Sequence, residues 1–240
     1  KSNVNLVSLK FYNNKDCSGI DVSNCINLQT LECYNTNISE LDVTKNTKLV
    51  TLKCSNTKIN KLDVENCTNL TVLECYNLEL DKLNVSNCTN LQILYCLRTQ
   101  ISELDVTNNK NLIFLRCNDT EIEELNIVNC DNLSQLYCNT TNIKKLEPIN
   151  CRKLSNLECS KTDISNLDLT NNIELTYLSC HNSNISKLDV SNNTKIQTLY
   201  CYEMKDLSDI DVKMNKDLVD FRCDSTSISS LDVTNNLKLE

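Results

Sequence analysis

Glycine and proline are almost absent from this chain, because its 240 residues contain one of each, and tryptophan is missing altogether. A low content of both usually indicates a helical protein, but 38 asparagines and frequent threonines disfavour helices. After glycine, asparagine is the residue that most readily adopts left-handed backbone angles. The chain is therefore predicted to turn often, with asparagine in the turns.

Basic clusters and long apolar segments are also absent. The formal net charge is −8 and no run of Lys or Arg occurs, so nucleic acid is not expected as a partner. The apolar runs are far shorter than the about 20 residues of a membrane-spanning helix, and residues 1–9 lack the apolar stretch of a signal peptide. Because the chain begins and ends inside a repeat pattern, we expect a fragment of a longer protein, in which missing targeting signals carry little weight.

A 21-residue repeat with the consensus LxxLxCxxTxIxxLDVxxNxx occupies nearly the whole chain. The repeats, counted from their leading residue as position 1, begin at Leu6, Leu28, Leu49, Leu70, Leu91, Leu112, Leu133, Leu154, Leu175, Ile196, Leu218 and Leu239. The repeats from Leu6 and Ile196 have 22 residues, with the extra residue at the same point in both. This predicts a local bulge within a single domain, residues 1–240, of roughly ten and a half repeats.

Each repeat has six apolar positions, arranged as two similar halves. In one repeat they are Leu70, Leu73, Cys75, Leu80, Leu83 and Val85. Each half ends in apolar residues two apart, the pattern of a short strand with one buried face. We therefore predict a mostly β solenoid with little or no helix, in which each coil has a strand on both sides and parallel strands stack about 4.8 Å apart.

The repeat resembles the leucine-rich repeats of bacterial surface proteins of the internalin kind, specifically the nested 21-residue class called IRREKO. The resemblance rests on LxxLxC followed ten residues later by IxxLxV, and it covers residues 6–240. It implies a right-handed leucine-rich-repeat solenoid, secreted or displayed on the cell surface, that contacts other proteins. The chain departs from the family in having Cys at position 6, where an aliphatic residue is common, so a reducing or cytoplasmic setting stays open.

The sixteen cysteines fall into two columns when the repeats are aligned. Ten occupy position 6, five occupy position 19 in place of Asn, and only Cys17 lies outside both columns. Stacked identical positions have parallel Cα–Cβ bonds about 4.8 Å apart, whereas a disulfide joins Cβ atoms about 3.8 Å apart. Buried free thiols are therefore expected, and because no CxxC pair occurs, no metal or other cofactor is predicted.

Two polar columns have simple structural interpretations. Position 15 is mostly Asp and should point outward, where it could bind cations or bond nearby hydroxyl and backbone groups. The second role is favoured, because calcium-binding solenoids use glycine-rich turns. Position 9 is mostly Thr; such arrays can resemble those of ice-binding proteins, but a residue that follows the strand is predicted to be an inward turn residue.

The sequence argues against an enzyme and predicts no catalytic residue. His181 is the only histidine, and adjacent strand residues point to opposite faces, so it forms no dyad with Cys180 of the inward column. No phosphate-binding loop or nucleophile elbow is present. A paired-carboxylate hydrolase stays open, although repeating carboxylates suit a structural column better.

Positions 3, 5 and 7 lie beside the inward residues of the first strand and differ most between repeats, so a binding site is expected there. Four consecutive repeats place an apolar, Tyr-rich patch at these positions, formed by Val72, Tyr76, Ile93, Tyr95, Leu97, Phe114, Arg116 and Tyr137. A second cluster comprises Tyr177, His181, Tyr200 and Tyr202. Exposed patches of this kind often mark protein-binding sites. Protein recognition is favoured; carbohydrate or cell-wall binding, self-association, a structural spacer and a simple strand-surface preference are alternatives.

Overall fold

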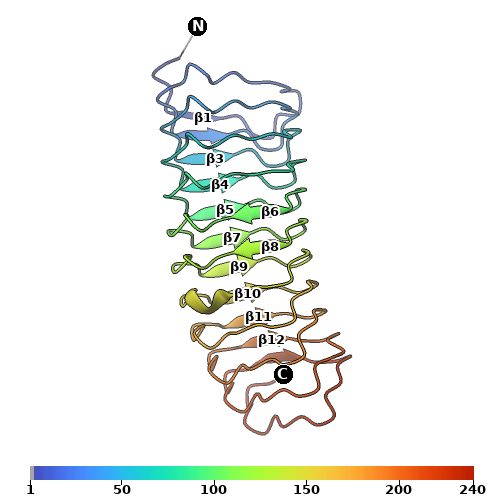
Figure 1. Ribbon diagram of the computed structural model, residues 1–240. Helices are drawn as coiled ribbons and strands as arrows, with labels where there is room; N and C mark the ends of the chain where they lie inside the picture. The colour runs from blue at the N-terminus through green and yellow to red at the C-terminus, as the bar shows by residue number, and fades with distance from the viewer. Residues whose placement is uncertain (1–2) are drawn as a thin grey trace.

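The computed structural model describes residues 3–240, which form a stack of similar coils (Figure 1). Eleven three-residue strands, one in each coil, pair in parallel along the stack. They are β1 (Ser8–Lys10), β2 (Thr30–Glu32), β3 (Thr51–Lys53), β4 (Val72–Glu74), β5 (Ile93–Tyr95), β7 (Phe114–Arg116), β9 (Gln135–Tyr137), β10 (Asn156–Glu158), β11 (Tyr177–Ser179), β12 (Thr198–Tyr200) and β13 (Asp220–Arg222). The predicted β solenoid is confirmed.

The register of this sheet follows the repeat. Equal repeat positions lie opposite each other, as Tyr95 does to Arg116. Where a repeat has 22 residues the register is kept, since Ser8 pairs with Thr30 and Thr198 with Asp220. The extra residue is therefore accommodated outside the strands, which confirms the predicted local bulge.

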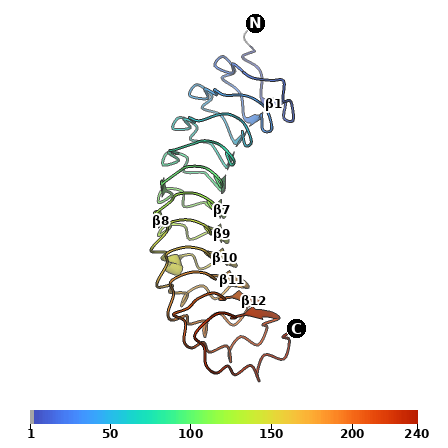
Figure 2. The ribbon, with the colours of Figure 1, turned by 90° about the vertical axis from the view of Figure 1, so that its right-hand side faces the viewer.

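The second side of the coils is less regular than the sequence predicted. Among residues 3–240 only two coils have a strand there, β6 (Glu103–Asp105) and β8 (Glu124–Asn126), which pair in parallel. Figure 2 shows the reason: the stack curves, with the long sheet on the inner side and β8 on the outer side. Coils diverge on the outer side of a curve, so their backbone groups lose the close spacing that a strand ladder needs.

Helical structure is limited to one turn among the described residues. The 3₁₀ helix η1 (Pro148–Asn150) follows the second half of its coil, and Pro148 occupies a position where other repeats have Val, Ile or Leu. Within residues 3–240 no helix is long and apolar enough to cross a membrane.

One continuous hydrophobic core runs through the coils. The six apolar positions point into it; in one coil Leu70, Leu73, Cys75 and Leu80 have no exposed surface. Because a coil buries these side chains only with the coils on either side, the stability of each coil depends on its neighbours.

A residue with left-handed backbone angles follows the first strand of every coil, at position 8. The φ angles lie between 52° and 60°, and none of these residues is glycine. Asparagine fills the position in five coils, at Asn13, Asn35, Asn56, Asn77 and Asn182. The first four form a side-chain ladder, in which each Nδ2 donates to the preceding Oδ1 at 2.6–2.8 Å. The predicted role of asparagine in the turns is confirmed for these coils.

The turn is closed by the threonine of position 9. Thr99 is buried, and its Oγ1 donates to the carbonyl oxygen of Cys96 at 2.8 Å. The same bond recurs in coil after coil. Position 9 is therefore an inward turn residue, as predicted.

Candidate protein-binding face

The variable positions of the repeat lie on the concave inner side of the stack. Positions 4 and 6 are buried in the core, so positions 3 and 5 of each strand point away from it, along the inside of the curve (Figure 2). A partner that entered the curve would contact side chains from many coils at once.

The structure brings the eight residues of the predicted patch together. Val72, Ile93 and Phe114 lie opposite one another at position 3 of successive strands. Tyr95, Arg116 and Tyr137 do so at position 5, and Tyr76 and Leu97 follow at position 7 of neighbouring coils. All eight are partly buried rather than fully exposed, which differs from the strong exposure that the sequence suggested. Neighbouring strands are so close that each large side chain covers part of the next.

Arg116 is the centre of this patch. Its guanidinium carbon lies 5.3 Å from the centroid of the Tyr95 ring and 4.5 Å from that of Tyr137. A guanidinium in this position is attracted by the negative faces of both rings. The three side chains therefore support one another as a stack across three coils.

The second predicted cluster is also assembled. Tyr177 and Tyr200 meet edge to face with centroids 6.0 Å apart, and His181 stacks on Tyr202 at 4.1 Å. Burial lowers the pKa of His181, and nearby Lys161 lowers it further.

Two residues of this cluster were missed by the sequence analysis. Arg222 lies over the other face of Tyr202, 4.3 Å from its centroid, and Asp220 accepts a hydrogen bond from the hydroxyl of Tyr200. That bond raises the pKa of Tyr200 to about 12. Both residues occupy variable positions of the following coil, so extending the list of positions 3 and 5 by one repeat would have found them.

The charged residues of position 5 in the first coils are paired with each other. Lys10 contacts Glu32 at 2.8 Å, and Lys53 contacts Glu74 at 2.9 Å. These contacts satisfy the charges within the sheet and leave them less available to a ligand.

Position 8 is less uniform from the patch onward. In three of the four coils of the patch, asparagine is replaced by Arg98, Asp119 and Thr140, all with φ near 54°. Coils beyond the patch replace it too, at Lys161, Glu203 and Ser225. Arg98 and Asp119 form an ion pair at 3.6 Å. For a residue that has a Cβ, left-handed backbone angles are unfavourable in free energy, most of all when the side chain is β-branched.

The aspartates of position 15 act as turn residues. Asp42 Oδ1 accepts hydrogen bonds from the backbone N–H of Thr44 at 2.9 Å and from its hydroxyl at 2.6 Å. These bonds lower the pKa of Asp42. The same arrangement recurs at Asp105 and Asp232. This agrees with the predicted bonds to hydroxyl and backbone groups.

Fourteen of the sixteen cysteines are buried, in the two predicted columns, whereas Cys17 and Cys223 are partly exposed; all sixteen are free thiols. Burial raises the pKa of the position-6 thiols far above the usual value, for example to about 12 at Cys96 and Cys159. Thiols of this kind are poor nucleophiles. Among residues 3–240 no cluster of His, Cys, Asp or Glu is arranged to hold a metal ion.

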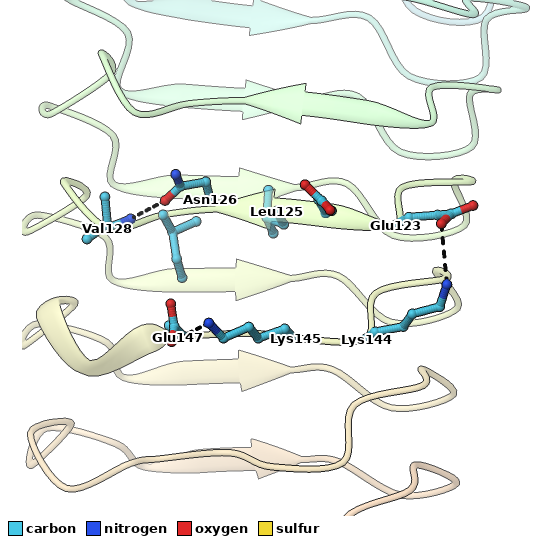
Figure 3. A pocket seen from close by; sticks show the side chains of 9 residues that line it. Glu123, Leu125, Asn126, Val128, Lys144, Lys145 and Glu147 are labelled. Carbon is cyan, nitrogen blue, oxygen red and sulfur yellow. Dashed lines mark hydrogen bonds and ion pairs between the residues drawn. The ribbon is translucent and has the colours of Figure 1, made fainter.

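A hollow of about 390 Å³ lies on the opposite, outer side of the stack, beside β8 (Figure 3). Four of its five charged side chains are paired with each other, since Lys144 contacts Glu123 at 3.4 Å and Lys145 contacts Glu147 at 2.8 Å. The hollow is therefore a weaker candidate than the concave face.

Comparisons with known proteins agree with this architecture. No protein-family model and no curated protein sequence matches the chain. Among solved structures, the functional domain of InlJ from Listeria monocytogenes is 32% identical with a TM-score of 0.81; the match covers 98% of this chain and 57% of that one. That domain includes a cysteine ladder. This chain thus spans somewhat more than half of the domain's length.

Two more distant structures share the fold. The internalin InlF of Listeria monocytogenes is 18% identical with a TM-score of 0.74, over 99% of this chain and 86% of that one. The plant peptide hormone receptor RGFR1, in complex with RGF2, is 16% identical with a TM-score of 0.73, over 97% of this chain and 46% of that one. Solenoids of this fold are typically not catalytic. Its 21-residue coils, cysteine column and likeness to InlJ identify the chain as an internalin-like leucine-rich-repeat protein.

Proposed function

We propose that this protein is a non-catalytic recognition scaffold that binds another protein through the concave face of its long sheet. The observation that carries the proposal is the patch around Arg116, where large apolar and aromatic side chains from four coils meet at the variable positions. Tyr, Phe and Arg are the residues that most often anchor protein interfaces. The structural relatives support the same role, because RGFR1 binds RGF2 and shares this fold.

We infer that the protein is secreted or displayed on a bacterial surface, as the internalin relatives suggest. The sixteen free thiols also fit a reducing compartment. Free thiols are compatible with a location outside the cell, because burial raises the pKa of the core thiols and their low reactivity slows oxidation.

The binding proposal is tested by selecting ligands for the wild-type chain from a phage-displayed library of random 12-residue peptides. Binding of the enriched phage to a double variant, Tyr95→Ser with Phe114→Asp, is then measured. We expect binding to fall to background, because the variant removes two central anchors of the patch. The matched control is Tyr12→Ser, which removes an exposed Tyr of the same face four coils away from Tyr95.

Circular dichroism of the variants separates loss of binding from loss of folding. Equal binding to wild type and folded double variant would contradict the proposal. A glycan array is probed in parallel, and glycans retained by the wild type but not by the double variant would assign the face to carbohydrate instead.

A further inference from the structure

The guanidinium of Arg116 is held in place but has no ionic partner. None of the nine ion pairs among residues 3–240 involves Arg116. Its Nε is buried without a hydrogen-bond partner within the described residues. Its guanidinium lies over the rings of Tyr95 and Tyr137. Rings satisfy the charge in part, but they accept none of the five N–H groups in the guanidinium plane.

Elsewhere in the same column the protein pairs its charges. Lys10 lies on Glu32 and Lys53 lies on Glu74, in adjacent coils. In the two coils beside that of Arg116, the same position of the strand holds Tyr95 and Tyr137 instead of a carboxylate. If the charge of Arg116 served only the fold, a carboxylate would be expected beside it, as in these two pairs.

The nearest acidic residue of the column that is free of a lysine partner also forms no ion pair with Arg116. Glu158 lies two coils from Arg116, with Tyr137 between them, and it makes no ion pair among residues 3–240. Burial raises the pKa of Glu158, and the lowering effect of Arg116 is smaller. Glu158 therefore acts on the guanidinium only as a charge at a distance and accepts none of its N–H groups.

We propose that Arg116 binds an acidic side chain of the protein partner, with the Tyr95 and Tyr137 rings orienting the guanidinium so that its N–H edge meets the carboxylate. The inference rests on the proposed function and adds the chemistry of the ligand. A planar guanidinium clamped between rings loses little freedom when it binds a carboxylate through two parallel hydrogen bonds. A lysine ammonium would lack both the plane that stacks and the paired donors.

The surroundings of Arg116 specify a second feature of the ligand. Phe114 lies two residues earlier on β7, on the same face, and Ile93 lies opposite Phe114. Two residues of a strand span about 7 Å, so the apolar row and the guanidinium are that far apart. The partner should therefore present an Asp or Glu about 7 Å from an apolar side chain, as at residues i and i+2 of an extended segment.

The test uses the peptides enriched on the wild-type chain, synthesised with Asp or Glu and with each acid replaced by Asn or Gln. Binding of both forms is measured by isothermal titration to the wild type, Arg116→Gln and Arg116→Lys. The control variant is Arg152→Gln, which removes an exposed arginine of a turn outside the patch. We expect the enriched sequences to combine an acid with an apolar residue. Neutralising the acid should weaken binding to the wild type roughly tenfold to a hundredfold, the range for a hydrogen-bonded charge pair.

The proposal predicts that the effect of neutralising the acid of the peptide depends on the presence of Arg116. On Arg116→Gln the acidic and neutral peptides should bind equally, Arg116→Lys should recover little of the difference, and Arg152→Gln should behave as wild type. If Arg116 only supported the Tyr rings, its replacement would weaken both peptide forms alike, and that result would overturn the proposal. Enriched peptides that lack acids but lose binding on the Tyr95 and Phe114 double variant would also overturn it, while leaving the binding face intact. Peptides that bind the double variant normally would contradict the proposed function itself.

Discussion

At the scale of single residues, the left-handed residue of each coil decides the local cost of the fold. Asn13, Asn35, Asn56 and Asn77 occupy it cheaply and join their side chains in a ladder. Thr140 occupies it at a cost, because a β-branched side chain crowds the backbone at positive φ. The position is therefore one where stability and side-chain chemistry compete.

We predict that Thr140→Asn stabilises the protein. The replacement keeps the backbone, at φ 55°, and exchanges a strained residue for one that tolerates these angles. The free energy of unfolding should rise by about 1 kcal/mol, measured by urea denaturation. Thr68→Asn makes the same exchange at an exposed position with ordinary backbone angles, and it should leave the midpoint unchanged. An equal shift in both variants would show that strain is not the cause.

At the scale of the structural element, position 19 forms a column that joins each coil to the one before it. Asn109 Nδ2 donates to the carbonyl oxygens of Val85 and Cys88, at 3.0 and 2.8 Å. Its own Oδ1 is buried without a partner among residues 3–240. A cysteine donates more weakly, as Cys88 does to Val64 at 3.6 Å, but it leaves no such acceptor unpaired. This balance explains how both residue types can occupy the same column.

The column predicts an order of stability for substitutions of Asn109. Asn109→Ala removes two buried hydrogen bonds, although the carbonyl oxygens of Val85 and Cys88 keep one backbone donor each, and it should cost about 2 kcal/mol in unfolding free energy. Asn109→Cys should cost clearly less, because five natural coils already use it. Chemical denaturation measures both, with Asn108→Ala at the exposed neighbouring position as the control. If Cys were no better than Ala at this position, the thiol bonds would have no role in the column.

At the scale of the whole molecule, the Asp turn of position 15 recurs along the stack and makes the stability of the protein depend on pH. Hydrogen bonds from the residue two positions later lower the pKa of six aspartates: Asp21, Asp42, Asp105, Asp168, Asp189 and Asp232. A lowered pKa in the folded state means that the folded protein holds its charged carboxylates more firmly than the unfolded chain does. Their contribution is complete above the unfolded pKa near 4 and is lost as pH falls through the lower folded values.

We therefore predict that thermal stability falls on acidification below about pH 4. A variant with Asn in place of Asp42, Asp105, Asp168 and Asp189 should lose much less between pH 5 and 2, since an Asn oxygen accepts the same backbone bond without titrating. Asn84 already does so, accepting from the N–H of Ser86 at 3.0 Å. The measurement is the unfolding temperature across this pH range.

The control for the acid experiment removes the same amount of charge elsewhere. It replaces four exposed acids outside the turns with their amides, at Glu40, Glu79, Glu121 and Asp163. This variant should keep the acid sensitivity of the wild type. Equal protection by both variants would assign the effect to net charge rather than to the turns.

Much of the molecule followed from the sequence because the same local rules apply in every coil. The period of 21 residues, the inward apolar positions, the Thr turn and the bulges of the 22-residue repeats all depend on residues within one coil or on identical residues in the next. The same holds for the neighbours of Arg116, since in-register stacking places equal positions side by side. The neighbours of each residue within the patch could therefore be predicted from the sequence.

The tertiary structure decided what depends on the curvature of the whole stack and on how large side chains share space. Curvature put the variable positions on a concave face and drew the outer sides of the coils apart (Figure 2). Within residues 3–240, β6 and β8 are therefore the only strands that pair on the outer side. The placement of Arg116 between two rings, without a carboxylate, depends on side-chain rotation between coils, which no repeat pattern encodes. The sequence by itself determined the coil, because every coil obeys the same short-range chemistry. The face and its unpaired guanidinium were decided only in the stack, where small differences between coils add up and side chains from separate repeats meet.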